Sequence, residues 1–244
     1  MSMSYIFREH IKQSLAVIAF LITLTACTSE SYDAGDGPNS YLTADLVLLH
    51  TSQDKSVRSA LLDDGTTLQF SNPFAQDWLT RPDSVYRALL YYDKTVAASD
   101  AAASNPTATS IVRARSVRPV PVLRPVEAED METLRTDPVG FESLWMSKNK
   151  SYINLSLLLK SGKTEADDAL HALGIVSHGT TTDADRRRTL HLTLYHDQGG
   201  VPAYYTVQQY VSIPTQLLEE ADTIELTLNT YNGKKVMKVA VSNL

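Results

Sequence analysis

The segment Thr189-Leu-His-Leu-Thr-Leu-Tyr195 is the clearest secondary-structure signal in the sequence. Its three leucines alternate with polar or amphipathic residues, and successive side chains of a strand point to opposite faces. The segment is therefore predicted to be a strand with one buried face. Similar period-two segments recur along most of the chain, and they predict an all-β protein.

The C-terminal part, residues 148–244, is predicted to form a β-sandwich. Asn232-Gly233 predicts a two-residue hairpin turn between the last two strands. Six or seven short antiparallel strands without helices are typical of a sandwich. Besides Thr189–Tyr195, we expect strands at 152–160, 171–177, 205–213, 223–231 and 235–241, with a short helical or looped crossover at 214–221.

The N-terminal part, residues 41–126, is predicted to form a separate small barrel. Asp63-Asp64-Gly65 separates two strand-forming runs, and Gly65 supplies the positive φ of a primed hairpin turn. Five short strands in about 80 residues suit a partly open, OB-like barrel. Strands are expected at 42–50, 57–62, 66–70, 84–94 and 110–118, and Pro119, Pro121 and Pro125 indicate an extended, edge-type path after them.

Residues 127–147 are predicted to be a junction between the two β units, because the period of the sequence changes there. Glu127–Glu132 and Pro138–Met146 are expected to be short helices. Asp137 is a plausible N-cap before Pro138 in the first turn.

Residues 1–26 have the order of an export signal. Arg8 and Lys12 precede the apolar run Leu15–Leu24, whose length of about 10 residues falls short of the roughly 20 needed to span a bilayer. Leu24-Thr-Ala-Cys27 then resembles the lipobox of bacterial lipoproteins. We therefore predict a lipoprotein signal peptide, with lipidation of Cys27. This residue is the only cysteine, so no intramolecular disulfide is possible.

Residues 27–40 are expected to be a flexible tether, because the stretch after Cys27 is small, polar and acidic. The chain has a formal net charge of −6, and removal of residues 1–26 takes away one net positive charge. This acidic balance does not suggest nucleic-acid binding. The expected location is the cell envelope, at the outer membrane through the lipid on Cys27, with the face of that membrane left open.

The chain resembles the NigD-like lipoproteins of Gram-negative bacteria. The resemblance rests on the order of several motifs, which together cover most of the chain. They are the lipobox at Leu24–Cys27, the hairpin Leu61-Leu-Asp-Asp-Gly-Thr-Thr-Leu68, the strand Ser84-Val-Tyr-Arg-Ala-Leu-Leu-Tyr-Tyr92, the run Ser143-Leu-Trp-Met-Ser147 leading to Tyr152-Ile-Asn-Leu155, and Leu190-His-Leu-Thr-Leu-Tyr-His-Asp197.

This resemblance implies an OB-like barrel followed by a β-sandwich, which agrees with the strand pattern. It implies no established activity and no catalytic residues. The family name comes from a bacteriocin gene cluster, so a bacteriocin-associated accessory or self-protection role is one alternative.

The histidines do not predict a metal site. His191 and His196 are five residues apart on one strand, so they should project to opposite faces. His171 and His178 have no carboxylate at ligand spacing, and neither His-Glu-x-x-His nor a cysteine pair occurs. We predict no metal and no cofactor.

Catalysis is not predicted either. The sequence has no Gly-x-Ser-x-Gly nucleophile motif. His196-Asp197 is expected to end a strand, and the hairpin turn accounts for Asp63 and Asp64. An envelope hydrolase acting on glycan or peptide remains an alternative. Its carboxylates would converge across a cleft, and such residues have no fixed separation along the sequence.

Two surface features allow binding but have simpler explanations. Arg113, Arg115, Arg118 and Arg124 either form a cationic face on the barrel or, as we prefer, protect a strand edge. Arg186-Arg-Arg188 is expected at a solvated turn. Tyrosines in or beside strands suit half-exposed packing as well as a binding surface, and they are Tyr86, Tyr91, Tyr92, Tyr204, Tyr205 and Tyr210.

Taken together, these features predict a lipid-anchored envelope protein that acts as a non-catalytic binding or accessory module, with a protein, peptide or glycan as its ligand.

Overall fold

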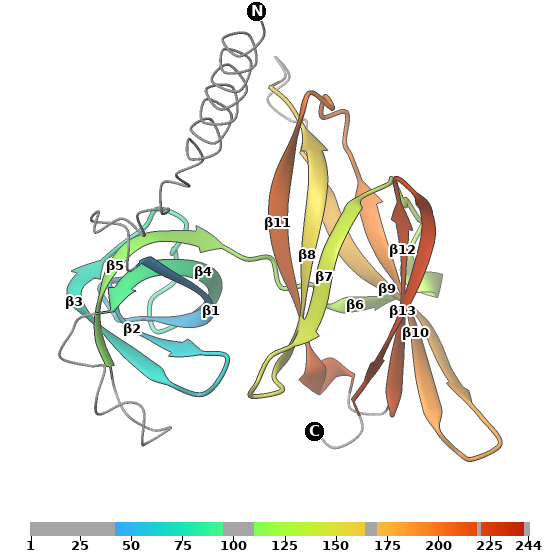
Figure 1. Cartoon of the computed structure of the whole chain (residues 1–244), viewed down its shortest axis with the longest axis horizontal. Helices are drawn as coiled ribbons and strands as arrows, with labels where there is room; N and C mark the ends of the chain where they lie inside the picture. The colour runs from blue at the N-terminus through green and yellow to red at the C-terminus, as the bar shows by residue number, and fades with distance from the viewer. Residues whose placement is uncertain (1–41, 95–109, 164–169, 219–220, 242–244) are drawn as a thin grey trace, which may run out of the picture. The chain divides into compact units, whose positions relative to one another are not determined.

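The computed structural model describes residues 42–94, 110–163, 170–218 and 221–241 (Figure 1). All regular elements longer than three residues in this part of the chain are β-strands, so the all-β prediction is confirmed. None of the helices in this part is long and apolar enough to cross a bilayer. The predicted signal peptide, Cys27 and the tether lie outside the described residues.

The first five strands form a closed barrel in the order β1-β2-β3-β5-β4. Only the β3–β5 pair is parallel, and it uses three residues of each strand. The barrel is OB-like as expected, although closed rather than partly open. Its strands are β1 (Leu42–Thr51), β2 (Val57–Leu62), β3 (Thr67–Phe74), β4 (Val85–Lys94) and β5 (Ser110–Pro119).

The β1 strand carries the unbroken apolar run Leu46–Leu49 because both of its faces are covered there. Val47 and Leu49 are fully buried in the barrel core. Leu46, on the opposite face, is buried outside the barrel in a cluster that includes Trp145 of the sandwich. A strand that is buried on both faces does not need to alternate apolar and polar residues.

The β2–β3 hairpin forms as predicted. Gly65 has a φ of +90°, and the Leu62 and Thr66 backbones bond across the turn at 2.9 Å. Asp64 accepts a hydrogen bond from the Thr66 amide, also at 2.9 Å. The side chain of the neighbouring Asp63 leaves the turn and pairs with Arg87 of β4.

The second β unit is a sandwich of a five-stranded and a three-stranded sheet (Figure 1). The sheet orders are β13-β12-β10-β9-β6 and β11-β8-β7, and leucine, isoleucine and valine side chains fill the space between them. The strands are β6 (Pro125–Glu127), β7 (Gly140–Met146), β8 (Tyr152–Ser161), β9 (Ala172–Thr182), β10 (Arg188–Asp197), β11 (Tyr205–Pro214), β12 (Thr223–Thr230) and β13 (Gly233–Ala240), with a 3-10 turn at Thr215–Leu217 in the predicted crossover.

The junction expected at 127–147 differs from the prediction. Pro138–Met146 is not a helix, since β7 pairs with β8 over most of this segment. The Glu127–Glu132 helix is only the 3-10 turn Ala128–Asp130. Asp137 accepts a hydrogen bond from the Gln198 amide instead of capping a helix. Long-range strand pairing has overridden the local helical signals.

The last hairpin is also shifted slightly. Thr230 pairs with Gly233, so the two loop residues are Tyr231 and Asn232. Gly233 begins β13 with a φ of +102°. The glycine with positive φ therefore follows the two loop residues, whereas the prediction made it the second of them.

Candidate functional site

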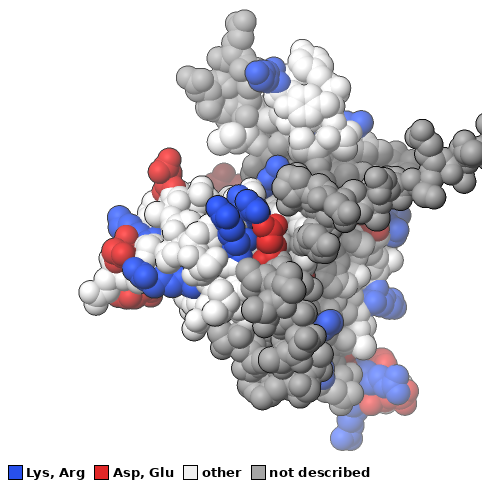
Figure 2. All heavy atoms as spheres, turned by 60° about the vertical axis from the view of Figure 1, so that its left-hand side comes forward, with Lys and Arg blue, Asp and Glu red and all other residues white. Residues whose placement is uncertain are grey.

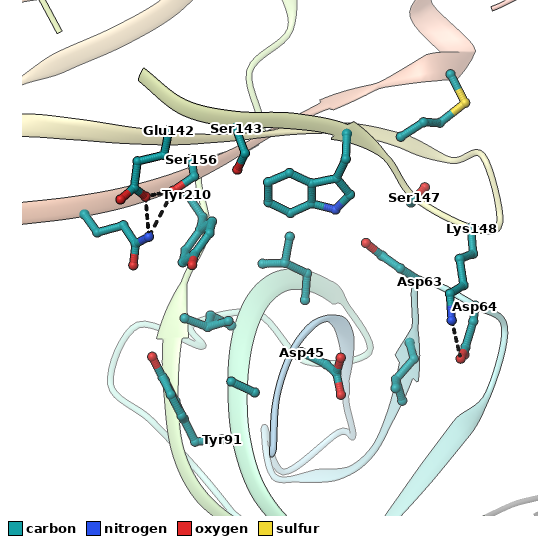
Figure 3. Close-up of a pocket in the computed structure, with 17 residues that line it drawn as sticks. Asp45, Asp63, Asp64, Tyr91, Glu142, Ser143, Ser147, Lys148, Ser156 and Tyr210 are labelled. Carbon is teal, nitrogen blue, oxygen red and sulfur yellow. Dashed lines mark hydrogen bonds and ion pairs between the residues drawn. The ribbon is translucent and has the colours of Figure 1, made fainter. Parts of the chain in front are cut away.

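A cleft of about 410 Å³ lies where the barrel meets the three-stranded sheet (Figure 3). The barrel wall comes from β1, the β2–β3 turn and β4, and the sandwich wall comes from β7, β8 and β11. The side chains that define its chemistry are acidic, aromatic and amide groups with one lysine, namely Asp45, Asp64, Tyr91, Glu142, Trp145, Lys148, Gln208 and Tyr210.

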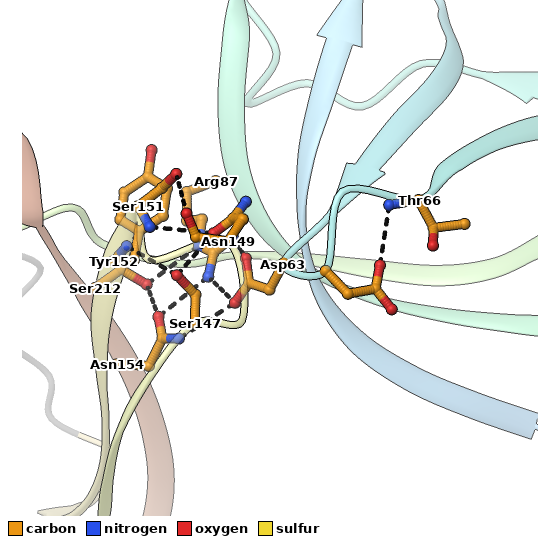
Figure 4. Close-up of polar contacts among 10 residues, drawn as sticks. Asp63, Thr66, Arg87, Ser147, Asn149, Ser151, Tyr152, Asn154 and Ser212 are labelled. Atoms are coloured by element: carbon orange, nitrogen blue, oxygen red, sulfur yellow. Dashed lines mark hydrogen bonds and ion pairs between the residues drawn. The ribbon is translucent and has the colours of Figure 1, made fainter. Parts of the chain in front are cut away.

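Arg87 on β4 joins the barrel to the sandwich beside this cleft (Figure 4). Its side chain is 1% exposed and forms a bidentate pair with Asp63, with N···O distances of 2.5 and 2.7 Å. It also donates to Asn154 Oδ1 at 3.0 Å and to Ser212 Oγ at 3.2 Å. The Tyr152 ring lies 4.4 Å from the guanidinium carbon, at cation–π distance.

The partners of Arg87 are also bonded to one another. Asn154 donates to Asp63 Oδ2 at 3.2 Å, and Ser212 donates to Asn154 Oδ1 at 2.7 Å. The Asn149 amide donates to the Asp63 carbonyl at 2.6 Å. A buried charge is tolerated only when its hydrogen bonds are satisfied. This polar cluster therefore holds the two walls of the cleft in one arrangement.

An apolar cluster completes the contact between barrel and sandwich. Leu46, Leu89 and Val120 are buried against the aromatic side chains that line the cleft. The rings of Trp145 and Tyr210 meet edge to face, with centroids 6.2 Å apart. Both aromatic side chains are thereby held by packing, and each still presents part of its surface to the cleft.

Glu142 is a carboxylate held in place by hydrogen bonds on the sandwich wall (Figure 3). Its Oε2 accepts from Ser156 Oγ at 2.6 Å and from Gln208 Nε2 at 2.5 Å. The hydrogen bond from Ser156, followed by that from Gln208, lowers the pKa of Glu142 below its ordinary value. The side chain is exposed and its other oxygen has no partner among the described residues, so it can accept from a ligand.

Two aspartates add negative charge on the barrel wall. Partial burial raises the pKa of Asp64, but the hydrogen bonds from Thr66 and the nearby Lys148 charge outweigh it, and the net pKa is lowered. Asp45 accepts from the Tyr92 hydroxyl at 2.8 Å. Burial, and then this contact with Asp45, raises the pKa of Tyr92. The cleft therefore carries three carboxylates besides Asp63 and only one lysine.

Ser147 and Ser156 of the cleft are engaged in hydrogen bonds with neighbouring side chains. The described lining of the cleft includes no histidine. Ser147 is buried and donates to Asn149 Oδ1 at 2.8 Å, and Ser156 is bound to Glu142. Nucleophilic catalysis by serine needs a general base within reach. Among the described residues that line the cleft, no serine lies beside a histidine, and the serine nearest a carboxylate is Ser156, which donates to Glu142.

The predicted separation of His191 and His196 is observed. His191 contacts Thr181 and Glu225, whereas His196 stacks on His171 with ring centroids 5.2 Å apart. In the part of the chain that the structure describes, no three metal-ligating side chains converge. His178 bonds to the Thr193 hydroxyl and belongs to neither cluster.

The His171–His196 pair was not predicted, and its hydrogen bonds define its tautomers. His196 Nδ1 lies 2.9 Å from the Asp137 carbonyl, which can only accept, so this nitrogen carries the proton. His196 Nε2 then accepts from His171 Nδ1 at 3.0 Å. His171 Nε2 is buried and has no hydrogen-bond partner in the described structure.

The arginine-rich stretch does not form the predicted protected edge. β5 pairs with β4 along most of its length and with β3 at its start, so it lies inside the closed barrel sheet. Arg115 is paired with Asp93, and Arg113, Arg118 and Arg124 are exposed. Figure 2, which brings the barrel side forward, shows basic and acidic side chains interspersed on the visible surface.

The tyrosines divide between the cleft and other places. Tyr91 and Tyr210 line the cleft. Tyr86 accepts a hydrogen bond from the Arg81 amide and packs edge to face on Trp78. Tyr204 is 80% exposed.

Arg186 lies in a loop whose backbone amides donate hydrogen bonds to Asp183, as expected of a solvated turn.

Sequence reasoning missed Arg87, Glu142 and Gln208, and it assigned Asp63 only to the turn. Arg87 was visible as a lone charge inside an apolar strand, which is a signal of a buried ion pair. Glu142 lay in a segment predicted to be helical, where its strand neighbours were not apparent.

The chain thus belongs to the class of two-unit β proteins in which an OB-like barrel precedes a sandwich. The family model described as the NigD-like C-terminal beta sandwich domain matches residues 122–241. Residues 122–241 therefore form a NigD-like C-terminal beta sandwich domain, and the resemblance that the motif order indicated is confirmed. No curated protein sequence matches it.

Solved structures share this fold. A NigD-like immunity protein from Bacteroides caccae is 24% identical, with a TM-score of 0.59 over 81% of this chain and 91% of that one. A provisionally assigned lipoprotein from Bacteroides fragilis is 15% identical (TM-score 0.56, 82% and 97%). A provisionally assigned toxin-related protein from Parabacteroides distasonis is 18% identical (TM-score 0.52, 81% and 92%).

Proposed function

We propose that this protein is a non-catalytic accessory module of the bacterial cell envelope that binds a partner in the cleft between barrel and sandwich. Acyl chains on Cys27 hold it at the outer membrane. The lipobox at Leu24–Cys27 supports this anchoring, as does the similarity to a provisionally assigned lipoprotein. More than one acyl chain is needed for stable attachment.

The construction of the cleft is the observation that carries the proposal. Glu142, Trp145 and Tyr210 are each held by neighbours before any partner arrives. The buried Arg87–Asp63 pair fixes the two walls on which they lie. A pre-organised surface loses little conformational entropy on binding, so it favours a binding role.

A hydrolase is less well supported. A glycosidase needs one carboxylic acid whose pKa is raised, so that it can protonate the leaving group. The pKa values of Glu142 and Asp64 are both lowered. Incubation with envelope glycans and peptides should give no cleavage. Cleavage by the wild type that is lost in Glu142→Gln would contradict the non-catalytic role.

A bacteriocin-related role is a second candidate function. Two similar structures are described as a NigD-like immunity protein and, provisionally, as a toxin-related protein. The gene should be deleted in a bacteriocin-producing strain and the sensitivity of that strain measured. Increased sensitivity that the wild-type gene restores supports self-protection, and unchanged sensitivity removes it.

The binding role is tested by capture with cleft variants. The lipoprotein is crosslinked in envelope extract as wild type, Glu142→Gln and Tyr91→Ala. Glu225→Gln is the matched control, because Glu225 is a hydrogen-bonded carboxylate on β12 that does not line the cleft. A species retained by wild type and control but lost from both cleft variants supports the proposal. Equal capture by all four proteins contradicts it.

The anchor and its face are tested separately. Mass spectrometry of the native protein should give an acylated Cys27 as the first residue. An intact Met1 or a free thiol at position 27 would exclude lipid anchoring. Protease treatment of intact cells distinguishes the outer surface, where the protein is cleaved, from the periplasmic face.

A further inference from the structure

One edge of the three-stranded sheet is open in the described part of the chain. In the order β11-β8-β7, β11 pairs with β8 alone. Its C-terminal half is covered by Pro121–Leu123: Ser212 donates to the Pro121 carbonyl at 2.9 Å, and Leu123 donates to the Ser212 carbonyl at 2.8 Å. None of the described strands other than β8 lies beside Tyr205–Tyr210 of β11.

The open half of β11 presents unpaired backbone groups. Alternate residues of a strand direct their N–H and C=O groups to opposite edges. Ser212 directs both groups away from β8, and the β11–β8 register is unbroken, so Thr206, Gln208 and Tyr210 do the same. The Tyr210 carbonyl accepts from Gln209 Nε2 at 2.8 Å. Thr206 and Gln208 offer their N–H and C=O groups to an added strand.

The other sheet edges of the sandwich are protected, and this half of β11 is not. β13 carries Lys234, Lys235 and Lys238, and β6 is only three residues long. β7 carries Glu142 and a register shift. Charge, shortness and bulges are the usual means of preventing strand addition. Tyr205–Tyr210 has no charge, no proline and no bulge.

The face of this edge adjoins the acidic cleft. Gln208 and Tyr210 line the cleft, and Gln208 reaches the Glu142 carboxylate at 2.5 Å (Figure 3). Alternate side chains of a strand added beside β11 would point toward this face. A long basic side chain directed there would face the Glu142 carboxylate and the rings of Trp145 and Tyr210, which attract cations. The charge of the cleft therefore selects a basic segment.

We infer that the Tyr205–Tyr210 edge of β11 binds an extended, basic segment of a partner protein as an additional strand. Backbone hydrogen bonds supply affinity and the acidic aromatic cleft supplies side-chain selection. The inference rests on the proposed binding role of the cleft, and it specifies the partner as a polypeptide rather than a glycan.

The test uses the detergent-solubilised lipoprotein and a displayed library of random peptides. Peptides selected on the wild type should have lysine or arginine at alternate positions and lack proline. Thr206→Pro removes one outward N–H without removing a bond to β8, and Thr206→Ala is its matched control. Fluorescence anisotropy of a selected peptide should give about tenfold weaker binding to Thr206→Pro than to Thr206→Ala, which keeps the outward N–H. Glu142→Gln should weaken it several-fold.

Several results would overturn the inference. A selection that enriches no peptide overturns it, and so does an enriched peptide that binds Thr206→Pro as tightly as the wild type. An N-methylated version that binds equally well would exclude backbone pairing. A wild-type dimer in light scattering that Thr206→Pro dissociates would assign the edge to a second copy of the chain. Envelope capture that needs Glu142 but not Thr206 would leave the proposed cleft function standing and reject strand addition.

Discussion

Two arginines on neighbouring barrel strands each meet an aspartate, and they differ mainly in depth. Arg87 on β4 is 1% exposed and bonds to residues of the sandwich, whereas the side chain of Arg115 on β5 is 42% exposed and bonds to Asp93 within the barrel. Charge pairs in water contribute little, while removal of one partner from a buried pair leaves a charge unsatisfied. The burial of the arginine, rather than the residue types of the pair, therefore decides which ion pair stabilises the contact between barrel and sandwich.

Removing the buried Arg87–Asp63 pair should have the largest effect on stability. Arg87→Ala leaves Asp63 and Asn154 without their main donor, and we expect a loss of about 3–5 kcal/mol in unfolding free energy. Urea unfolding followed by tryptophan fluorescence measures it. Arg87→Lys keeps the charge but not the bidentate fork, so its loss should be smaller. A loss below that of Arg115→Ala would contradict the role of depth.

Removing the apolar half of the contact should have a smaller effect. Trp145→Ala deletes a half-buried ring packed on Tyr210 and near Leu46, at a cost of about 2 kcal/mol. The same variant removes an aromatic wall of the cleft, so ligand capture should fall with it. Trp145→Phe is the control that retains most of the packing. A Trp145→Ala protein as stable as the wild type would mean that the polar cluster alone joins the units.

The half-buried His171 adds a prediction for the pH dependence of stability. Desolvation, and then the nearby His196, lowers the pKa of His171 from its ordinary 6.5. The unfolded chain then binds this proton more readily than the folded one, so stability should fall as pH drops through 6.5 toward the lowered folded value. Thermal unfolding between about pH 7.5 and 5 measures the loss.

His171→Gln should remove this part of the pH dependence, and the control His178→Gln, at an exposed site, should not. The acids Glu142, Asp64 and Glu225 have lowered pKa values, so their contribution is lost only at more acidic pH. An unchanged slope in His171→Gln would assign the effect to another group.

Breaking the shallow pair should have the smallest effect. Arg115→Ala removes an ion pair whose arginine side chain is 42% exposed, and we expect a loss below about 1 kcal/mol in unfolding free energy. The loss should shrink further in high salt, because exposed charges are screened. Denaturant unfolding at two salt concentrations measures both effects. A loss near that of Arg87→Ala would show that the exposed pair is also structural.

The sequence predicted the strands well where one face meets water. Thr189–Tyr195 and the hairpin at Gly65 carry their pattern locally, through alternation and through a positive φ. The prediction failed at Pro138–Met146, because the short apolar run there was read with a helical period although β8 supplies its partner. The protected-edge prediction for Arg113–Arg124 failed for the same reason: barrel closure is a long-range event.

The sequence by itself determined the β class, the order of the two units and the family, because alternation, turns and motif order are local properties of the chain. Only the tertiary structure decided the site. Arg87 meets residues 24, 67 and 125 positions away, and Glu142 meets Gln208 at a separation of 66. Such contacts arise when the barrel packs on the sandwich and strands pair, and no local spacing encodes them.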